Sequence, residues 1–537
     1  MWNTANLGNV ESSDGGWIML MGEVINTGNT VTAKDGTDIR LDCNLTGGTL
    51  ATIGTGQFHI MRYPRYLTDV TLAGTLQLTS ENEGYPASAR IKGSLNLDDA
   101  TVVLLGPTGR LYGNVSATPV TGSGTILFQG DPATPDDSKS GVQGLDLGPG
   151  ITARTGQRGG TLSGVINRGQ VFSQTPGQKL TLTSVDNHGT VEASNGGLLR
   201  LSSLVNNGVV AIDGTTANID GTWTNANGTI RASNGATINA LTSPTDLGSL
   251  QLACSAIYLA GKWTASQISG ISAVQSTLIL TSGNSELDNS NGNLVIGPGT
   301  ELRLAGSAIR GGTVSGAEGA RLAVPTKNTA NLYGVTLTLP TTIEDGASLR
   351  ASDMLKLDGG RISLVNTASA ATTLEVLAPS VSGNGQIVFD GIASANRLSF
   401  PTSLTIEAGI TIRTGAAGGT IGSDASKALV SQGTISAQTP GQTITVRCGA
   451  NSITNQGLMQ AANGSSLNIY NLTTSGALSA SSGGTINLYG TFANTGSVNV
   501  NDGTVNLFAS FALDSLRNIT QSGPNAAIVL QTSVALG

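Results

Sequence analysis

Asp98 and Asp99 form the best local pair of carboxylates in the sequence, and such a pair could carry out acid-base chemistry. Glycoside hydrolysis needs two carboxyl groups held about 5–9.5 Å apart. Neighbouring residues of a strand point to opposite faces, so we expect these two side chains to diverge. The equivalent position in a second copy of the motif is Asp358-Gly359, where one carboxylate is missing. A surface turn is therefore the preferred interpretation of Asp98-Asp99.

The two histidines, His59 and His188, could act as general bases, but neither has a Ser, Cys or Asp partner that its spacing identifies. His188 occupies the middle of an Asn-x-Gly motif. Other copies of that motif carry different residues there, namely Arg168, Asn207, Gln456 and Thr495. Because these residues interchange, we expect an exposed turn and no catalytic role.

A calcium ion is the one cofactor for which the sequence offers a weak candidate site, the loop with Asp131, Asp136 and Asp137. Calcium takes six to eight oxygen ligands, often from such loops. The loop lacks the repeated GGxGxD motif that would make the signal strong, so a solvated loop is preferred and no metal or catalytic residue is predicted. The cysteines have neither zinc-ligand nor disulfide spacing, and we expect buried small side chains at Cys43, Cys254 and Cys448.

Two other residue sets are better explained by structure than by ligand binding. The paired glycines at 311–312 and 418–419 are not followed by a phosphate-binding motif, so we expect turns there. The arginine pairs Arg40/Arg303 and Arg154/Arg413 recur at matched positions. We expect these arginines to cap exposed carbonyls or to pair with nearby acids.

The composition of the 537 residues excludes several classes of protein. Charged residues make up 11% of the chain, with 27 Lys+Arg against 34 Asp+Glu, where a soluble domain has about 25%. The surface must therefore be built from Gly, Asn, Ser and Thr, which argues against a helical protein. Regularly spaced apolar residues argue against disorder, and the absence of a basic cluster argues against nucleic acid. The compact apolar run at 17–21 is too short for a membrane span.

A long internal repeat organises the chain. Three segments of the first half return in the second, at offsets of 263, 259 and 264 residues: 36–41 with 299–304, 150–156 with 409–415, and 174–178 with 438–442. A spacing of 5 and 3 residues between apolar positions marks three starts, at Trp2, Trp263 and Phe511. These starts predict repeat units at 1–262 and 263–510 and the start of a third unit at 511–537. We expect the chain to be part of a longer array whose units stack end to end.

A shorter period of about 20 residues lies inside each unit. It is marked by Asn-x-Gly motifs, in which Asn and Gly suit a left-handed turn, at Asn26, Asn167, Asn187, Asn206, Asn455 and Asn494. Short runs with a period of two lie between the motifs and predict strands. The predicted fold is an all-β, right-handed parallel β-helix with rungs of about 20 residues. Its core should contain the stacked side chains Val191, Leu199, Leu201, Ile219 and Ile230.

With these turns and the recurrent GTI and GTV segments, such as 189–191, the chain resembles parallel β-helix repeat proteins of bacterial surfaces. Autotransporter passengers, filamentous-haemagglutinin-like adhesins and giant tandem-repeat surface proteins are of this type. The resemblance implies an exported protein that works outside the cell. A sequence poor in candidate sites and rich in repeated turn and core positions predicts a non-enzymatic stalk or fibre segment, and the repeated unit starts predict end-to-end contact with its own kind. A glycan or host receptor would bind elsewhere in the full protein. The alternative is a carbohydrate-binding or carbohydrate-cleaving β-helix similar to tailspikes and pectin lyases, which an aromatic and carboxylate cluster confined to one unit would favour.

Overall fold

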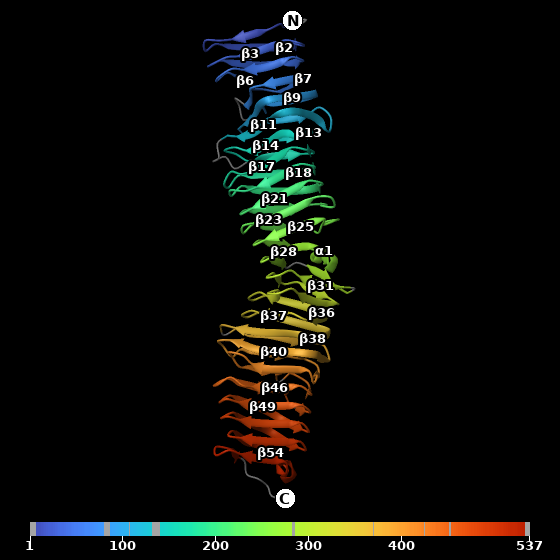
Figure 1. Ribbon diagram of the computed structural model, residues 1–537, viewed down its shortest axis with the longest axis vertical. Helices are drawn as coiled ribbons and strands as arrows, with labels where there is room; N and C mark the ends of the chain where they lie inside the picture. Colours follow the sequence, from blue (N-terminus) through green and yellow to red (C-terminus); the bar gives the residue numbers. More distant parts are fainter. Residues whose placement is uncertain are drawn as a thin grey trace. The chain divides into compact units, whose positions relative to one another are not determined.

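The computed structural model describes residues 7–79, 86–106, 108–130, 140–281, 285–290, 292–368, 370–423, 425–449 and 453–531. It is 63% strand and 2% helix, and its parallel strands form a β-solenoid of about 24 turns with about 21 residues each (Figure 1). The predicted fold class is confirmed. Helix within the described ranges is limited to α1 (Ala265–Ser269) and the 3-10 turn η1 (Leu513–Leu516).

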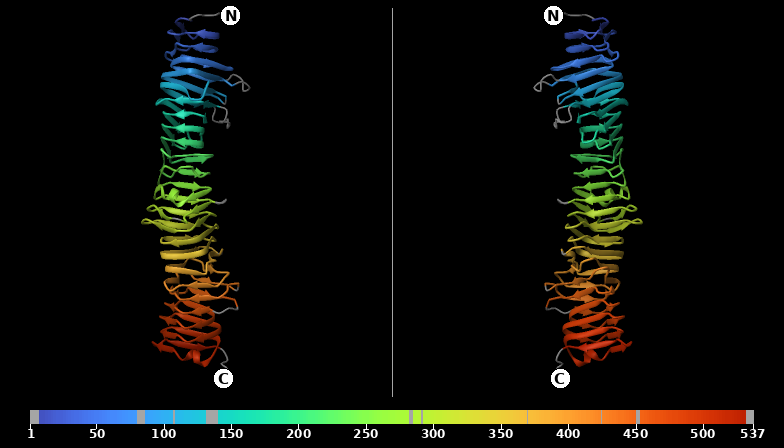
Figure 2. Two further views of the ribbon diagram at one scale, coloured as in Figure 1. Left: turned by 90° about the vertical axis from the view of Figure 1, so that its right-hand side faces the viewer. Right: turned by 90° about the vertical axis from the view of Figure 1, so that its left-hand side faces the viewer.

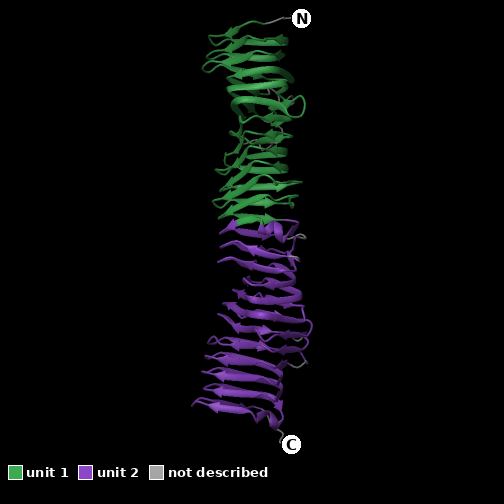
Figure 3. Ribbon diagram, turned by 45° about the vertical axis from the view of Figure 1, so that its right-hand side comes forward, with its two compact units in different colours: residues 1–259, 270–272 green, residues 260–269, 273–537 purple. Residues whose placement is uncertain are grey.

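The chain forms two compact units (Figure 3). Unit 1 contains residues 1–259 and 270–272, and unit 2 contains residues 260–269 and 273–537. In each unit the strands lie in parallel layers, as the side views in Figure 2 also show, and each strand pairs with the strands one turn earlier and later. The boundaries of the sequence duplication at 262 and 510 stay predictions.

Unit 1 shows how the alternating sequence builds a core. Five strands pair in register, so that Val171, Val191, Val210, Ile230 and Leu250 form one column of side chains that are at most 1% exposed. Their neighbours along each strand point outward. The strands are β17 (Gln170–Ser173), β19 (Thr190–Ala193), β21 (Val209–Asp213), β23 (Thr229–Ser233) and β25 (Ser249–Ala253).

A second set of paired strands in unit 1 supplies another column of core side chains. Leu182, Leu201, Ile219 and Ala240 align in register and are buried. All five side chains predicted to stack inside the solenoid are therefore confirmed as core. The strands are β18 (Lys179–Asn187), β20 (Leu198–Asn206), β22 (Thr216–Asp220) and β24 (Thr237–Ala240).

Unit 2 repeats this arrangement. Leu467, Ile486 and Val505 align on β50 (Ser466–Thr474), β52 (Thr485–Asn494) and β54 (Thr504–Phe511), and all three are buried. Because the same inward positions are filled on successive turns, each side chain packs on the one above and the one below.

The glycines of the Asn-x-Gly motifs are needed for a different reason from the left-handed turn that we expected. Of the six, Gly28 alone has a positive φ, whereas Gly189 and its equivalents do not. A Cβ at Gly189 would overlap the carbonyl oxygen of Gly169 one turn away, and a Cβ at Gly208 would overlap that of Gly189. These glycines are therefore required by close approach of the backbone. The left-handed turns lie at other pairs, such as Asn195-Gly196, with φ of 53° and 77°.

Candidate functional site

The asparagines of the motifs form a buried ladder in unit 1. The Nδ2 atom of Asn167 donates to Oδ1 of Asn187 at 2.7 Å, Asn187 donates to Asn206 at 2.7 Å, and Asn206 donates to Asn225 at 2.6 Å. All four side chains are at most 1% exposed. Asn225 ends the ladder by donating to the carbonyl of Leu247 at 2.7 Å. A buried amide is costly without partners, so the ladder specifies which turn lies against which.

A second buried feature, a set of hydrogen bonds between a threonine and a neighbouring loop, is the same in both units. In unit 1 the Oγ1 atom of Thr155 accepts hydrogen bonds from the backbone N–H groups of Gln174 and Thr175, at 3.0 and 3.2 Å. In unit 2 Thr414 accepts from the equivalent Gln438 and Thr439, at 2.9 and 3.1 Å. The loop threonine donates back to a glycine carbonyl at 2.6 Å in both copies. The identical QTPGQ segments thus share one structural role.

Two of the recurrent arginines behave as expected. Arg303 lies with Nη1 3.4 Å from Glu301 and Nη2 2.7 Å from Glu344. Arg413 donates to the carbonyl of Thr414 at 3.1 Å, and burial lowers the pKa of its guanidinium, with the nearby charge of Arg361 acting in the same direction. These side chains stabilise the surface of unit 2.

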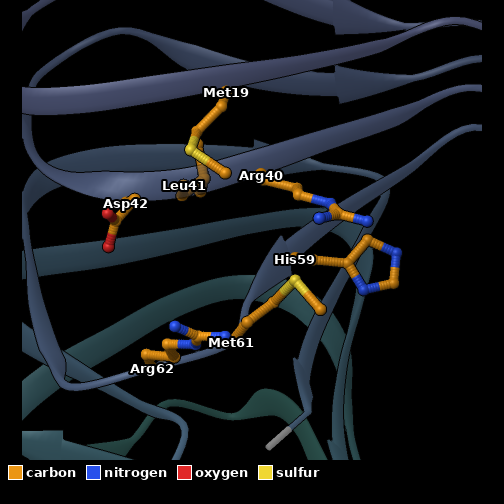
Figure 4. Close-up of a pocket in the computed structure, with 7 residues that line it drawn as sticks. All are labelled: Met19, Arg40, Leu41, Asp42, His59, Met61 and Arg62. Atoms are coloured by element: carbon orange, nitrogen blue, oxygen red, sulfur yellow. The ribbon is translucent and has the colours of Figure 1, made fainter. Parts of the chain in front are cut away.

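Arg40, the counterpart of Arg303, is different. It makes no ion pair within the described residues, and its guanidinium carbon lies 5.3 Å from the ring centroid of Trp17. It faces a hollow of about 180 Å³ on the outer side of β2 (Trp17–Ile25), β4 (Asp38–Thr46) and β6 (Gln57–Ile60). Figure 4 shows its guanidinium beside the imidazole of His59. The hollow is lined by Met19, Arg40, Leu41, Asp42, His59, Met61 and Arg62.

Both histidines have an aspartate beside them that the spacing did not identify. Nε2 of His59 lies 3.2 Å from Oδ1 of Asp38 but outside hydrogen-bonding geometry. Nε2 of His188 lies 3.1 Å from Oδ2 of Asp186, which precedes it by two residues near the end of β18. His188 itself lies in the exposed turn after this strand, as expected. The aspartate two residues before His188 was the available signal.

Asp98 and Asp99 do not point to opposite faces, contrary to expectation. Both are exposed, because Asp99 has a φ of 49° and lies at an irregularity in the pairing of β9 (Ser88–Leu105) with β11 (Thr118–Gln129). Oδ1 of Asp99 accepts a hydrogen bond from Ser123 at 2.6 Å. Gly359 of unit 2 adopts the same left-handed conformation, with a φ of 77°. The preferred turn interpretation fits this geometry.

Unit 2 carries an aromatic stack that the sequence analysis missed. The rings of Tyr470 and Tyr489 lie 4.8 Å apart and those of Tyr489 and Phe508 lie 4.9 Å apart, all on the outer face of β50, β52 and β54. Arg447 covers the first ring at 5.4 Å. Burial raises the pKa of Tyr489, with Tyr470 adding to the effect. The signal was present in the spacing, because the three aromatics are each 19 residues apart.

The described residues bear on the candidate calcium site and on the three cysteines. Asp131, Asp136 and Asp137 lie outside the described ranges. Within these ranges, no group of three or more His, Cys, Asp or Glu side chains could hold a metal ion. Cys43 and Cys448 are buried, and burial raises the pKa of each thiol to about 12. Cys254 is exposed, so the expectation that all three are buried is wrong.

Neither α1 nor η1, the two helices of the described chain, is long and apolar enough to cross a membrane. Comparison of the chain with known protein families and with curated proteins finds no match.

Proposed function

We propose that the chain is a structural segment of an extracellular bacterial surface protein, a stalk or fibre of tandem β-solenoid units without enzymatic activity. The observation that supports this most is the hydrogen-bonded loop that both units share at Thr155 and Thr414. Residues that recur because of a scaffold role are expected to be internal and hydrogen-bonded to the backbone, as these are.

The surfaces of the two units vary around this common scaffold. One turn after the shared loop, unit 1 exposes Arg200, which pairs with Asp220 at 2.8 Å. The matched position of unit 2 is Asn468, which accepts a hydrogen bond from Asn487 at 2.7 Å. Different surface residues thus serve the same purpose of joining adjacent turns, which fits a structural role better than a retained binding site.

Antibodies raised against the purified chain test the location. We expect them to label intact cells of the source bacterium, and external protease to remove the signal. Labelling that appears only after the cells are permeabilised would contradict the extracellular assignment. An internal protein of the same cells serves as the control for leakage.

The proposed partner is another unit of the same fold. On β56 (Ala527–Leu530), Ile528 and Leu530 continue the core columns of Val505 and Leu507. Leu530 is 49% exposed, whereas Leu507 is 1% exposed. An apolar strand with this exposure is covered when a further strand pairs with its edge.

Sedimentation velocity over a range of protein concentrations tests the stacking. We expect association that grows with concentration and that Leu530→Lys reduces. Val529→Lys, on the outward face of the same strand, is the matched control and should associate like the native chain. Equal association of both variants would argue against pairing at this edge.

A carbohydrate-binding role is the second candidate, because the stacked aromatic rings found among the described residues all lie in unit 2. Tyr470, Tyr489 and Phe508 form a continuous row of stacked rings on the outer face of β50, β52 and β54. A glycan array comparing the native chain with Tyr489→Ala tests it. Loss of a specific signal in the variant would support this role.

A further inference from the structure

The surroundings of Arg40 set it apart from Arg303, its counterpart in unit 2. Its neighbours in the sheet are Met19 on β2 and His59 on β6. At the matched position on β32 (Glu301–Leu304), Arg303 has Ile279 and Ala323 as neighbours. Two carboxylates neutralise Arg303, whereas no carboxylate of the described residues pairs with Arg40.

Two arginines, Arg40 and Arg62, line the hollow, in a chain whose net charge is −7. Arg62 already interacts with another group. Asp42 also lines it, but this carboxylate already forms an ion pair with Arg65 on the neighbouring turn. Asp38 lies beside the imidazole of His59. An anionic group entering the hollow would therefore gain from the guanidinium group of Arg40, with which no described carboxylate forms an ion pair.

Apolar surface adjoins this charge. Trp17 is 63% exposed, and Met19 and Met21 on the same strand are 40% and 66% exposed. Arg40 lies over one face of the Trp17 ring, which orients its guanidinium by a cation–π contact. An exposed indole next to fixed N–H donors is suited to a ligand with one apolar face and one charged group.

We infer that this hollow binds the carboxylate of an acidic sugar, a hexuronate residue of a polysaccharide that lies across unit 1. The planar carboxylate matches the hydrogen-bonding fork of Arg40, and the CH-rich face of the sugar packs on Trp17. At about 180 Å³ the hollow is below the range of roughly 300–1,000 Å³ that holds a drug-sized molecule. It therefore takes one residue of a chain whose remainder crosses the open surface.

Isothermal titration of the full chain with trigalacturonate tests the site, with neutral galactotriose as the ligand control. We expect trigalacturonate to bind and galactotriose not to bind. Arg40→Gln and Trp17→Ala should each weaken binding at least tenfold. Arg303→Gln, at the matched position of unit 2, should leave it unchanged. Circular dichroism checks that each variant keeps its strand content.

Three results would overturn the inference: no binding of trigalacturonate by the native chain, equal binding of the neutral sugar, or unchanged binding by Arg40→Gln. Vesicles of phosphatidylglycerol provide a further arm. Binding to these vesicles that depends on Arg40, without binding to trigalacturonate, would assign the site to a lipid surface instead. The inference goes beyond the scaffold role, which the cell-labelling experiment tests independently.

Discussion

Asn187 is held by the turns on both sides of it. It accepts from Asn167, donates to Asn206, and also donates to the carbonyl of Val209 at 3.2 Å. Since each amide has one oxygen and two N–H groups, a column of asparagines can satisfy itself indefinitely with one spare donor for the backbone. No smaller polar side chain in this position does the same.

Asn187→Ala should lower the free energy of unfolding by about 1–3 kcal/mol. It removes the amide donor of Asn206 Oδ1, which keeps only the 3.4 Å bond from the N–H of Gly208, and the amide acceptor of Asn167 Nδ2. Asn227→Ala is the matched control, since Asn227 donates to Asn207 in an exposed ladder at 3.1 Å. The control substitution should lower the free energy of unfolding by about 0.5 kcal/mol or less. Urea denaturation measures both, and equal losses would show that burial of the ladder is unimportant.

The thiols should differ in reactivity. At pH 8 a thiol reagent should label Cys254 in the folded chain and all three cysteines after denaturation, because Cys43 and Cys448 are buried. Cys254→Ala should abolish the native reaction. Rapid native labelling of Cys43 or Cys448 would contradict the burial.

Stability should also fall at high pH. The pKa of Cys43 and Cys448 rises from 9.0 to about 12 on folding, so the unfolded chain loses these protons first. The contribution is fully present below pH 9 and is lost as the pH rises toward 12. Urea denaturation of the native chain at pH 8 and pH 10 measures this loss. It should shrink when both cysteines are replaced by alanine.

At the scale of the elements, a column of glycines brings adjacent turns together where the chain leaves one sheet for the next. Thr190 donates to the carbonyl of Gly169 at 2.9 Å, and Val209 donates to that of Gly189 at 2.9 Å. A side chain on either glycine would push this carbonyl away from its donor. The element boundary is therefore fixed by backbone packing.

Gly189→Ala should destabilise unit 1 by several kcal/mol, a magnitude typical of overpacking and lost hydrogen bonds together. Gly16→Ala is the control, because the nearest atom to its added Cβ is the carbonyl oxygen of Ser13 at 3.5 Å and its φ is not positive. Thermal unfolding followed by circular dichroism compares them. A Gly189→Ala chain as stable as the control would show that the turns can separate without cost.

At the scale of the whole molecule, each turn contacts the turns next to it, so stability is expected to be a sum of local terms. Ile230→Asp places an unpaired charge in a column between Val210 and Leu250. Hydrogen exchange should show lost protection on β21, β23 and β25 and retained protection on β50 to β54. Arg231→Asp, the outward neighbour, should leave the pattern unchanged. Uniform loss across the chain would show a single cooperative unit.

The sequence by itself determined the class of fold, because the inward positions of a solenoid follow from alternation and a fixed period. Val191 and Ile230 could be assigned to the core in this way, and the identical QTPGQ segments at 174–178 and 438–442 indicated the long repeat. These features depend on neighbours along the chain and on the repeat length, both of which the sequence contains.

Only the tertiary structure decided which side chains meet across turns. The 19-residue spacing of Tyr470, Tyr489 and Phe508 becomes a stack because their strands pair in one register. Arg40 and Arg303 have similar sequence contexts, GTDIRL and GTELRL, yet Arg303 is neutralised by Glu344, 41 residues further on. The partner of an outward side chain depends on the number of residues in each turn and corner. A difference of one residue there changes which side chains lie side by side.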